Sequence, residues 1–167
     1  MKRIALCSIA IASLLGATSV QRAQQDGAAI DSGRLPAEYR DWRLISVAHE
    51  EGDLHSFAAV LGNDVAIQAF RDGKLPFPDG TIIVALHWKH VPSEENDKIF
   101  GRAQSFVAGL PTNVQFMVKD STKYAETGGW RFAHFVNGKP DPAVSLDACF
   151  ACHKAEPRDL VFTRYAP

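Results

Sequence analysis

The chain has 167 residues, of which 46% are hydrophobic, so it is long enough for one domain with its own core. Its 18 basic residues are balanced by 19 acidic ones, and the formal charge is −1. With no basic run along the chain, this composition excludes a nucleic-acid-binding protein of the usual basic type.

The first segment predicts export. Met1-Lys2-Arg3 is a short basic start, and the residues that follow are mainly apolar to about Val20. We expect a signal peptide over residues 1–23, cleaved between Ser19 and Ala23, and hence a periplasmic protein with no membrane segment after cleavage. The alternative is a retained anchor, for which the apolar run is marginal, because about 20 apolar residues are needed to cross a bilayer.

The segment after the signal peptide predicts a leader followed by a single domain. Residues 24–35 are polar and rich in Gly and Ala, and we expect them to be flexible. The domain spans residues 36–167. Its first strand is predicted at residues 42–48, and Asn63 is placed to cap a helix that runs to about Asp72.

The remaining elements are mostly strands. Residues 81–89 form the clearest one, and their apolar first half predicts burial on both faces. Two short strands are predicted at residues 106–108 and 114–118, separated by a turn at Gly-Leu-Pro-Thr-Asn, and another at residues 130–136. Short strands with few helices predict an α+β fold, mainly an antiparallel β-sheet with packed helices.

The run Cys149-Phe150-Ala151-Cys152-His153 carries the clearest chemical signal. It matches the C-x-x-C-H pattern for covalent attachment of a c-type haem near the C-terminus. Each thiol, of Cys149 and of Cys152, adds to one haem vinyl group, and His153 binds the iron as the proximal ligand. Cys7 lies in the signal peptide, so the pattern predicts one haem c and no structural disulfide in the mature chain.

Two other uses of the cysteine pair fit the sequence less well. A redox dithiol usually opens a helix after an early strand of a βαβ pattern, which this chain lacks around Cys149 and Cys152. A structural zinc site needs four ligands, and no second cysteine pair is present to complete one.

With these residues in view, the chain resembles the cytochrome P-460 family, which includes cytochrome c-prime-beta. The resemblance spans residues 36–165 and rests on the late C-x-x-C-H, on Asp159-Leu160-Val161-Phe162-Thr163-Arg164-Tyr165 and on shorter pieces. These pieces are Pro36-Ala37-Glu38-Tyr39-Arg40-Asp41-Trp42, Phe77-Pro78-Asp79-Gly80-Thr81, Val118-Lys119-Asp120-Ser121 and Gly129-Trp130. The resemblance implies an antiparallel sheet with helices, one c-type haem and a homodimer.

Residues at two positions separate the branches of this family by their chemistry. Its namesake oxidises hydroxylamine with a haem cross-linked to a lysine and assisted by a glutamate, and the corresponding positions here are Ala85 and Gln115. Lys89 lies about 13 Å further along the strand, at about 3.3 Å per residue. An amide cannot take a proton as a carboxylate does. Whether the chain is an enzyme stays open, and hydroxylamine oxidation is disfavoured.

The other branch of the family binds nitric oxide in a pocket capped by phenylalanine, for which the candidates here are Phe57, Phe70 and Phe77. These three residues would be equally ordinary in a core. The other histidines, His49, His55, His90 and His134, are expected to be solvated or part of the sheet.

Two residues are candidates for a sixth iron ligand. Strand alternation places His87 on the same side as Ala85, and Met117 on the same side as Gln115. His87 is expected at the rim of the pocket, because a step of two residues moves a side chain nearly 7 Å along a strand.

Three functions follow from these residues. The first is binding of nitric oxide, or a related small diatomic or nitrogen-oxide ligand, at an open haem site. The second is electron transfer to a redox partner protein, with His87 or Met117 as sixth ligand. The third is an oxidoreductase that acts on hydroxylamine or nitric oxide.

Overall fold

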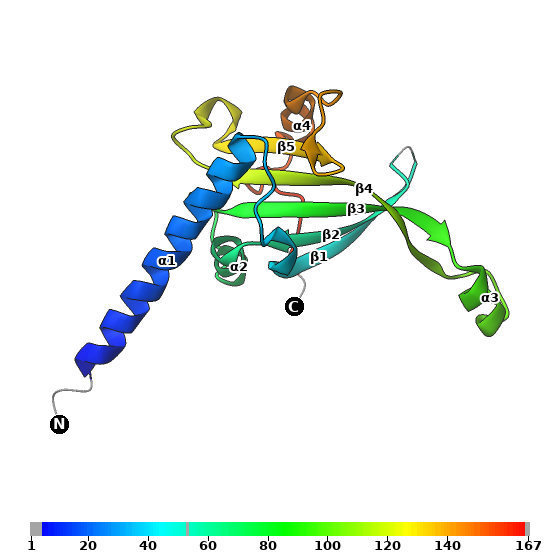
Figure 1. Cartoon of the computed structure of the whole chain (residues 1–167), viewed down its shortest axis with the longest axis horizontal. Coiled ribbons are helices and arrows are strands. Elements are labelled where there is room, and N and C mark those ends of the chain that lie inside the picture. The colour runs from blue at the N-terminus through cyan, green and yellow to red at the C-terminus, as the bar shows by residue number, and fades with distance from the viewer. Residues whose placement is uncertain (1–4, 53, 166–167) are drawn as a thin grey trace.

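The computed structural model describes residues 5–52 and 54–165, with side chains from residue 18 onward. Its centre is a six-stranded antiparallel sheet in which each strand pairs with the next along the chain (Figure 1). The strands are β1 (Arg43–Glu50), β2 (Ser56–Gly62), β3 (Ile82–Pro92), β4 (Phe106–Lys119), β5 (Trp130–Val136) and β6 (Lys139–Pro140). The α-helices are α1 (Ala5–Asp31), α2 (Asp64–Arg71), α3 (Glu94–Phe100) and α4 (Leu146–His153). The predicted α+β fold is confirmed.

Strand β3 is buried on both faces of the sheet, as its apolar run predicts. Ile82, Val84 and Leu86 are buried in the core on one face, and Ile83 is buried in the core on the other. Because side chains alternate along a strand, Ala85 lies on the same face as Ile83.

The face that holds Ile83 is covered by α2, by α4 and by the C-terminal segment. Helix α2 begins as predicted, because the Asn63 side chain accepts a hydrogen bond from the N–H of Ala66 at 3.0 Å. Its Ile67 and Phe70 pack into the same core as Val161 of the C-terminal segment. The haem motif lies in α4 on this face.

The opposite face is covered by the end of α1. Ile30 is buried with Phe116 and Phe135 of the sheet, and the carboxylate of Asp31 forms an ion pair with Arg131 at 2.8 Å. Of the predicted flexible leader at residues 24–35, the part up to Asp31 is helical and contacts the sheet, and its flexibility stays a prediction. A single buried isoleucine and a paired carboxylate hold the segment to the sheet, which composition alone does not reveal.

Strand β4 also departs from expectation, because it is one continuous strand. The predicted turn at residues 109–113 lies inside it, and the pairing with β3 shifts register on both sides of the Trp88–Pro111 pair. Proline lacks an N–H and is tolerated at such irregularities. Strand β2 was not predicted.

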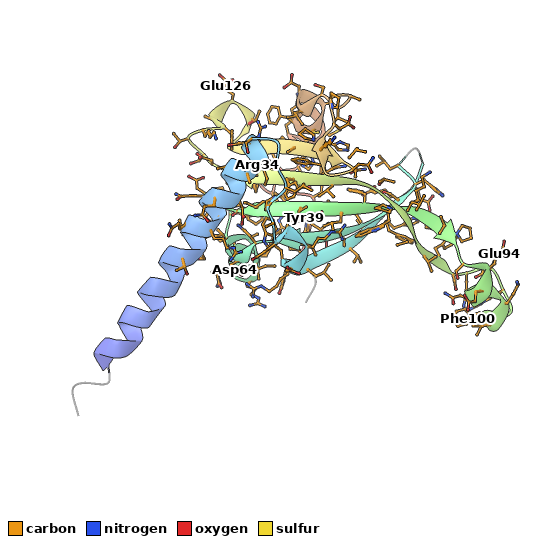
Figure 2. The ribbon with its side chains drawn as sticks, in the orientation of Figure 1. Arg34, Tyr39, Asp64, Glu94, Phe100 and Glu126 are labelled. Carbon is orange, nitrogen blue, oxygen red and sulfur yellow. The ribbon has the colours of Figure 1, made fainter. Side chains whose placement is uncertain are left out.

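The β3–β4 hairpin extends beyond the body of the sheet and carries α3 at its tip (Figure 1). Ile99 and Phe100, in α3, are 75% and 58% exposed. Phe100 lies at the far end of this arm (Figure 2). The hairpin and α3 are called the β3–β4 arm below.

Candidate haem site

Helix α4 carries the haem motif in its last turns. Cys149 and Cys152 are three residues apart, so one helical turn places both thiols on the same side. Cys149 is half-buried and Cys152 is exposed, and both are free thiols. Burial, and then the neighbouring Cys152, raises the pKa of the Cys149 thiol. The pair is therefore accessible and unbonded, as attachment to haem requires.

His153 is oriented by a backbone carbonyl. Its Nδ1 lies 2.7 Å from the carbonyl oxygen of Leu160, which can only accept a hydrogen bond. Nδ1 therefore carries the proton, and Nε2 keeps the lone pair that binds a metal. The ring lies against Phe132 and Phe162, with ring centroids 4.9 and 5.1 Å away.

A cavity of about 700 Å³ joins the motif to the sheet. Cys149, Cys152 and His153 form one wall, and the side chains of the sheet form the other. The sheet wall includes Ala85, His87, Gln115, Met117 and His134. The volume lies within the range of about 300–1,000 Å³ that ligand sites occupy. Two accessible thiols, a free imidazole nitrogen and a cavity of this size together fit a covalently attached haem.

The described residues offer no competing metal site. In residues 18–52 and 54–165, whose side chains the structure describes, no group of three or more His, Cys, Asp or Glu side chains could hold a metal ion. A structural zinc at Cys149 and Cys152 needs four ligands and so has no support in this part of the chain.

The family described as cytochrome P460 matches residues 36–163, which is most of the chain. The chain belongs to the cytochrome P460 family. Membership implies a haem cofactor and makes the chain a c-type cytochrome of this family. Comparison with curated proteins finds no match.

The two positions that the resemblance aligns with the lysine and glutamate of the hydroxylamine-oxidising branch meet in the cavity. Ala85 pairs directly with Gln115 across β3 and β4, and Gln115 pairs with His134 across β4 and β5. Paired positions share a face, so the three side chains form a row across the sheet wall of the cavity. No lysine is among the described residues that line this cavity.

His134 is a cavity residue that was not predicted from the sequence. It was assigned to the sheet, but its side chain also lines the cavity, and Nδ1 lies 3.3 Å from a carboxylate oxygen of Asp141. With Nδ1 toward Asp141, the ring nitrogen left for the cavity is Nε2. Its alternation with Phe132, which lines the same cavity, was the signal that could have identified it.

His87 is among the residues that line the cavity, on the same face of β3 as Ala85. It is half-buried, and its Nδ1 is 3.4 Å from the hydroxyl of Ser56. Burial lowers the pKa of His87, His134 lowers it further, and Glu50 opposes the shift. The imidazole is therefore neutral near pH 7, a form that can accept a hydrogen bond or bind iron.

The three phenylalanines expected to cap the iron do not line the cavity. Phe57 pairs with Trp88 and faces the opposite side of the sheet, where it contacts His49 and His90. Phe70 and Phe77 pack against each other in the core, with ring centroids 4.9 Å apart. The phenylalanines that do line the cavity are Phe116 and Phe132 of the sheet and Phe162 of the C-terminal segment.

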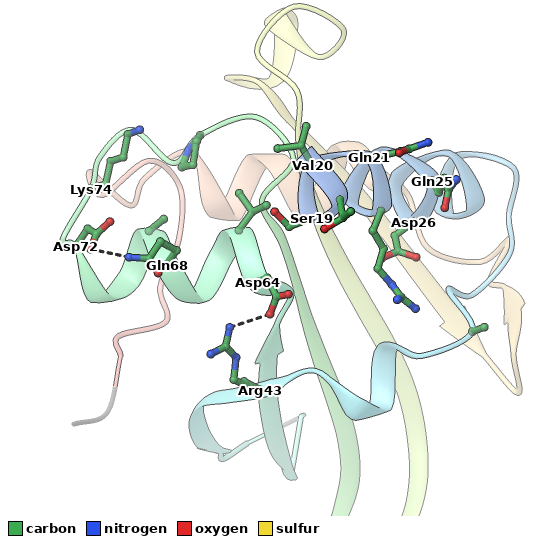
Figure 3. Close-up of a pocket in the computed structure, with 16 residues that line it drawn as sticks. Ser19, Val20, Gln21, Gln25, Asp26, Arg43, Asp64, Gln68, Asp72 and Lys74 are labelled. Carbon is green, nitrogen blue, oxygen red and sulfur yellow. Dashed lines mark hydrogen bonds and ion pairs between the residues drawn. The ribbon is translucent and has the colours of Figure 1, made fainter. Parts of the chain in front are cut away.

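A larger open pocket of about 1,150 Å³ lies between α1 and α2 (Figure 3). Its lining includes the Arg43–Asp64 ion pair at 2.8 Å, and no cysteine or histidine is among the described residues around it. Residues 18–22, Gln25 and Asp26 of α1 form part of its wall, and the first five of these overlap the expected end of the signal peptide. Nothing in this pocket connects it to the haem motif.

Proposed function

We propose that this protein is an exported monohaem c-type cytochrome that binds nitric oxide, or a related small nitrogen-oxide ligand, at an open iron site. Cys149 and Cys152 hold the haem through two thioether bonds, and His153 is the proximal ligand. The observation that carries the proposal is the single cavity in which these three residues face Ala85 on β3. When bound, the haem supplies the iron to which the small ligand attaches.

The residues opposite the motif decide between the branches of the family. Ala85 has no nucleophile for a cross-link and leaves space where the oxidase has a lysine side chain. Gln115 offers an amide, which donates and accepts hydrogen bonds but takes no proton from a substrate. Gln115 and the Nε2 of His134 can hydrogen-bond to a bound ligand from the sheet wall. This chemistry suits ligand binding better than hydroxylamine oxidation.

The second candidate is an electron-transfer cytochrome. Its support is that His87 and Met117 both line the cavity, and that burial keeps His87 neutral. A bond from either side chain to iron would fill the sixth position and leave no site for gas. The protein would then need a redox partner protein.

Export to the periplasm is proposed from the basic and apolar start of the chain. In residues 5–52 and 54–165, no helix combines the length and apolar character needed to cross a membrane. Cleavage between Ser19 and Ala23 would leave Ile30 and Asp31 in place against the sheet. We propose a homodimer from the family resemblance, with the exposed apolar residues of the β3–β4 arm at the contact.

The deciding experiment is a visible spectrum of the purified ferrous protein, taken before and after addition of nitric oxide. A denaturing gel stained for haem establishes covalent attachment, and a Cys149→Ala/Cys152→Ala variant is its control. A broad high-spin spectrum that changes on gas addition supports the proposal. Sharp low-spin bands that resist the gas would overturn it in favour of electron transfer.

A further inference from the structure

Two consecutive residues near the C-terminus have an unusual backbone. Asp159 and Leu160 have φ angles of 52° and 66°, in the left-handed region that residues with a side chain rarely adopt. Such residues persist only where surrounding contacts hold them, and they cluster at functional sites. The carbonyl of Leu160 is the acceptor for Nδ1 of His153.

A buried ion pair holds this segment. Nζ of Lys119 lies 2.8 Å from Oδ1 of Asp159, and their side chains are 5% and 11% exposed. Oδ2 of Asp159 accepts a second hydrogen bond, from the N–H of Phe77 at 2.8 Å. Lys119 also donates to the carbonyl of Gly128 at 3.0 Å and lies over the Trp130 ring, 4.9 Å from its centroid.

A buried pair of this kind is weak grounds for stability alone. Removing two charges from water costs free energy that their attraction only partly offsets, and apolar replacements are often as stable. The Lys119–Asp159 pair instead holds Asp159, whose backbone is left-handed. The carbonyl of the next residue, Leu160, orients His153. An ion pair that only stabilised the fold would not need to lie beside the carbonyl that accepts the hydrogen bond from His153.

We propose that the Lys119–Asp159 ion pair is a positioning device for the proximal haem ligand. It holds the left-handed segment so that the Leu160 carbonyl stays against Nδ1 of His153. This keeps the proton on Nδ1, fixes the plane of the imidazole and raises its basicity toward iron. The inference rests on the proposed role of His153 as the proximal ligand.

The test is a Lys119→Met/Asp159→Asn double variant of the haem-loaded protein, which removes both charges and leaves neither buried alone. We expect the iron–histidine stretching band of the ferrous protein to shift to lower frequency and the reduction potential to become more positive. Both follow from a weaker hydrogen bond at Nδ1 of His153. If a sixth ligand hides the band, the potential is the readout.

Among the residues whose side chains the structure describes, a second and more exposed lysine–aspartate pair provides a control. Lys123 pairs with Asp31 on the opposite side of the sheet, and a Lys123→Met/Asp31→Asn variant should keep the wild-type band and potential. A wild-type band and potential in the Lys119→Met/Asp159→Asn protein would overturn the proposal, even if that protein is less stable. Equal shifts in both double variants would also overturn it.

A single substitution provides the test if the double variant does not fold. Lys119→Gln keeps one donor but loses the charge, and we expect a smaller shift in the same direction. A folded Lys119→Gln protein with an unchanged band and potential would count against the proposal. Absence of covalent haem in the wild-type protein would instead refute the proposed function, so the two failures are distinguishable.

Discussion

Ala85 of β3 and Gln115 of β4 are direct cross-strand partners, and both side chains line the cavity that faces the haem motif. They stand where the resemblance places the lysine and the glutamate of the hydroxylamine-oxidising branch. Their pairing means that the two replacements change one continuous patch of the cavity wall. The patch is neutral and lacks a nucleophile.

An Ala85→Lys variant, loaded with haem and treated with hydrogen peroxide, should form a modified haem. Replacing a haem C–H bond with a bond to the lysine nitrogen releases two protons and two electrons, and the peroxide accepts the electrons. A lysine at this position enters the cavity opposite Cys149 and Cys152, where the resemblance places the family's cross-link. The mass of the haem-containing protein and its visible spectrum should both change from those of the wild type. Ala85→Met, which is similar in length but has no amine, is the control and should keep an unmodified haem. An unmodified haem in the lysine variant would show that Ala85 is not the cross-linking position.

Replacement of His87 separates the two main functions. If the iron site is open, the ferrous spectrum of His87→Ala should match that of the wild type, and nitric oxide should still bind. Met117→Ala is the matched control for the other candidate ligand in the same cavity. A change from low-spin to high-spin bands in either variant would identify the sixth ligand and support electron transfer.

Acidification should destabilise the protein through His90. This residue is 5% exposed, neither ring nitrogen has a hydrogen-bond partner, and the rings of His49 and His55 lie 4.3 and 4.8 Å away. Burial lowers the pKa of His90, the two neighbouring histidines lower it further, and Glu51 opposes them. Below about pH 6.5 the unfolded chain therefore binds more protons than the folded one, and the free energy of unfolding falls as the pH falls.

Denaturant unfolding at about pH 7.5 and about pH 5.5 measures this effect, since the two values bracket the ordinary histidine pKa. A His90→Phe variant should lose part of the difference between the two conditions, because phenylalanine fills the site without titrating. His49→Phe leaves the buried imidazole of His90 in place, and this variant should keep most of the difference in unfolding free energy between the two pH values. An unchanged difference in His90→Phe would assign the acid sensitivity to other groups, among them His87.

The β3–β4 arm should mediate the proposed homodimer. Ile99 and Phe100 are exposed at its tip, and apolar side chains gathered on a projecting element are typical of an association surface. An Ile99→Glu/Phe100→Glu variant should be monomeric by light scattering, with an unchanged haem spectrum. Leu44→Glu/Val47→Glu on β1 removes equally exposed apolar side chains elsewhere and should stay dimeric. A dimer that survives the first variant, or a monomeric wild type, would contradict this assignment.

Much of the local structure was predictable from the sequence. The Asn63 cap and α2, the burial of β3 on both faces, and β5 follow from residue type and periodicity over a few neighbours. The motif at Cys149–His153 and the shared face of Ala85 and His87 follow from spacing in the same way. These features depend on contacts within one turn or one strand.

The tertiary structure decided which of these residues meet. The packing of α4 over one face of the sheet brings Cys149 and His153 to the same cavity as Ala85 and Gln115, which lie far away in the chain. The pairing of β2 with β3 places Phe57 on the opposite face. Tertiary packing also decided the burial of Ile30, the continuity of β4 and the formation of the Lys119–Asp159 pair. Such contacts join segments whose separation carries no periodic signal, because their free energy comes from burial and pairing across the fold rather than from neighbours along the chain.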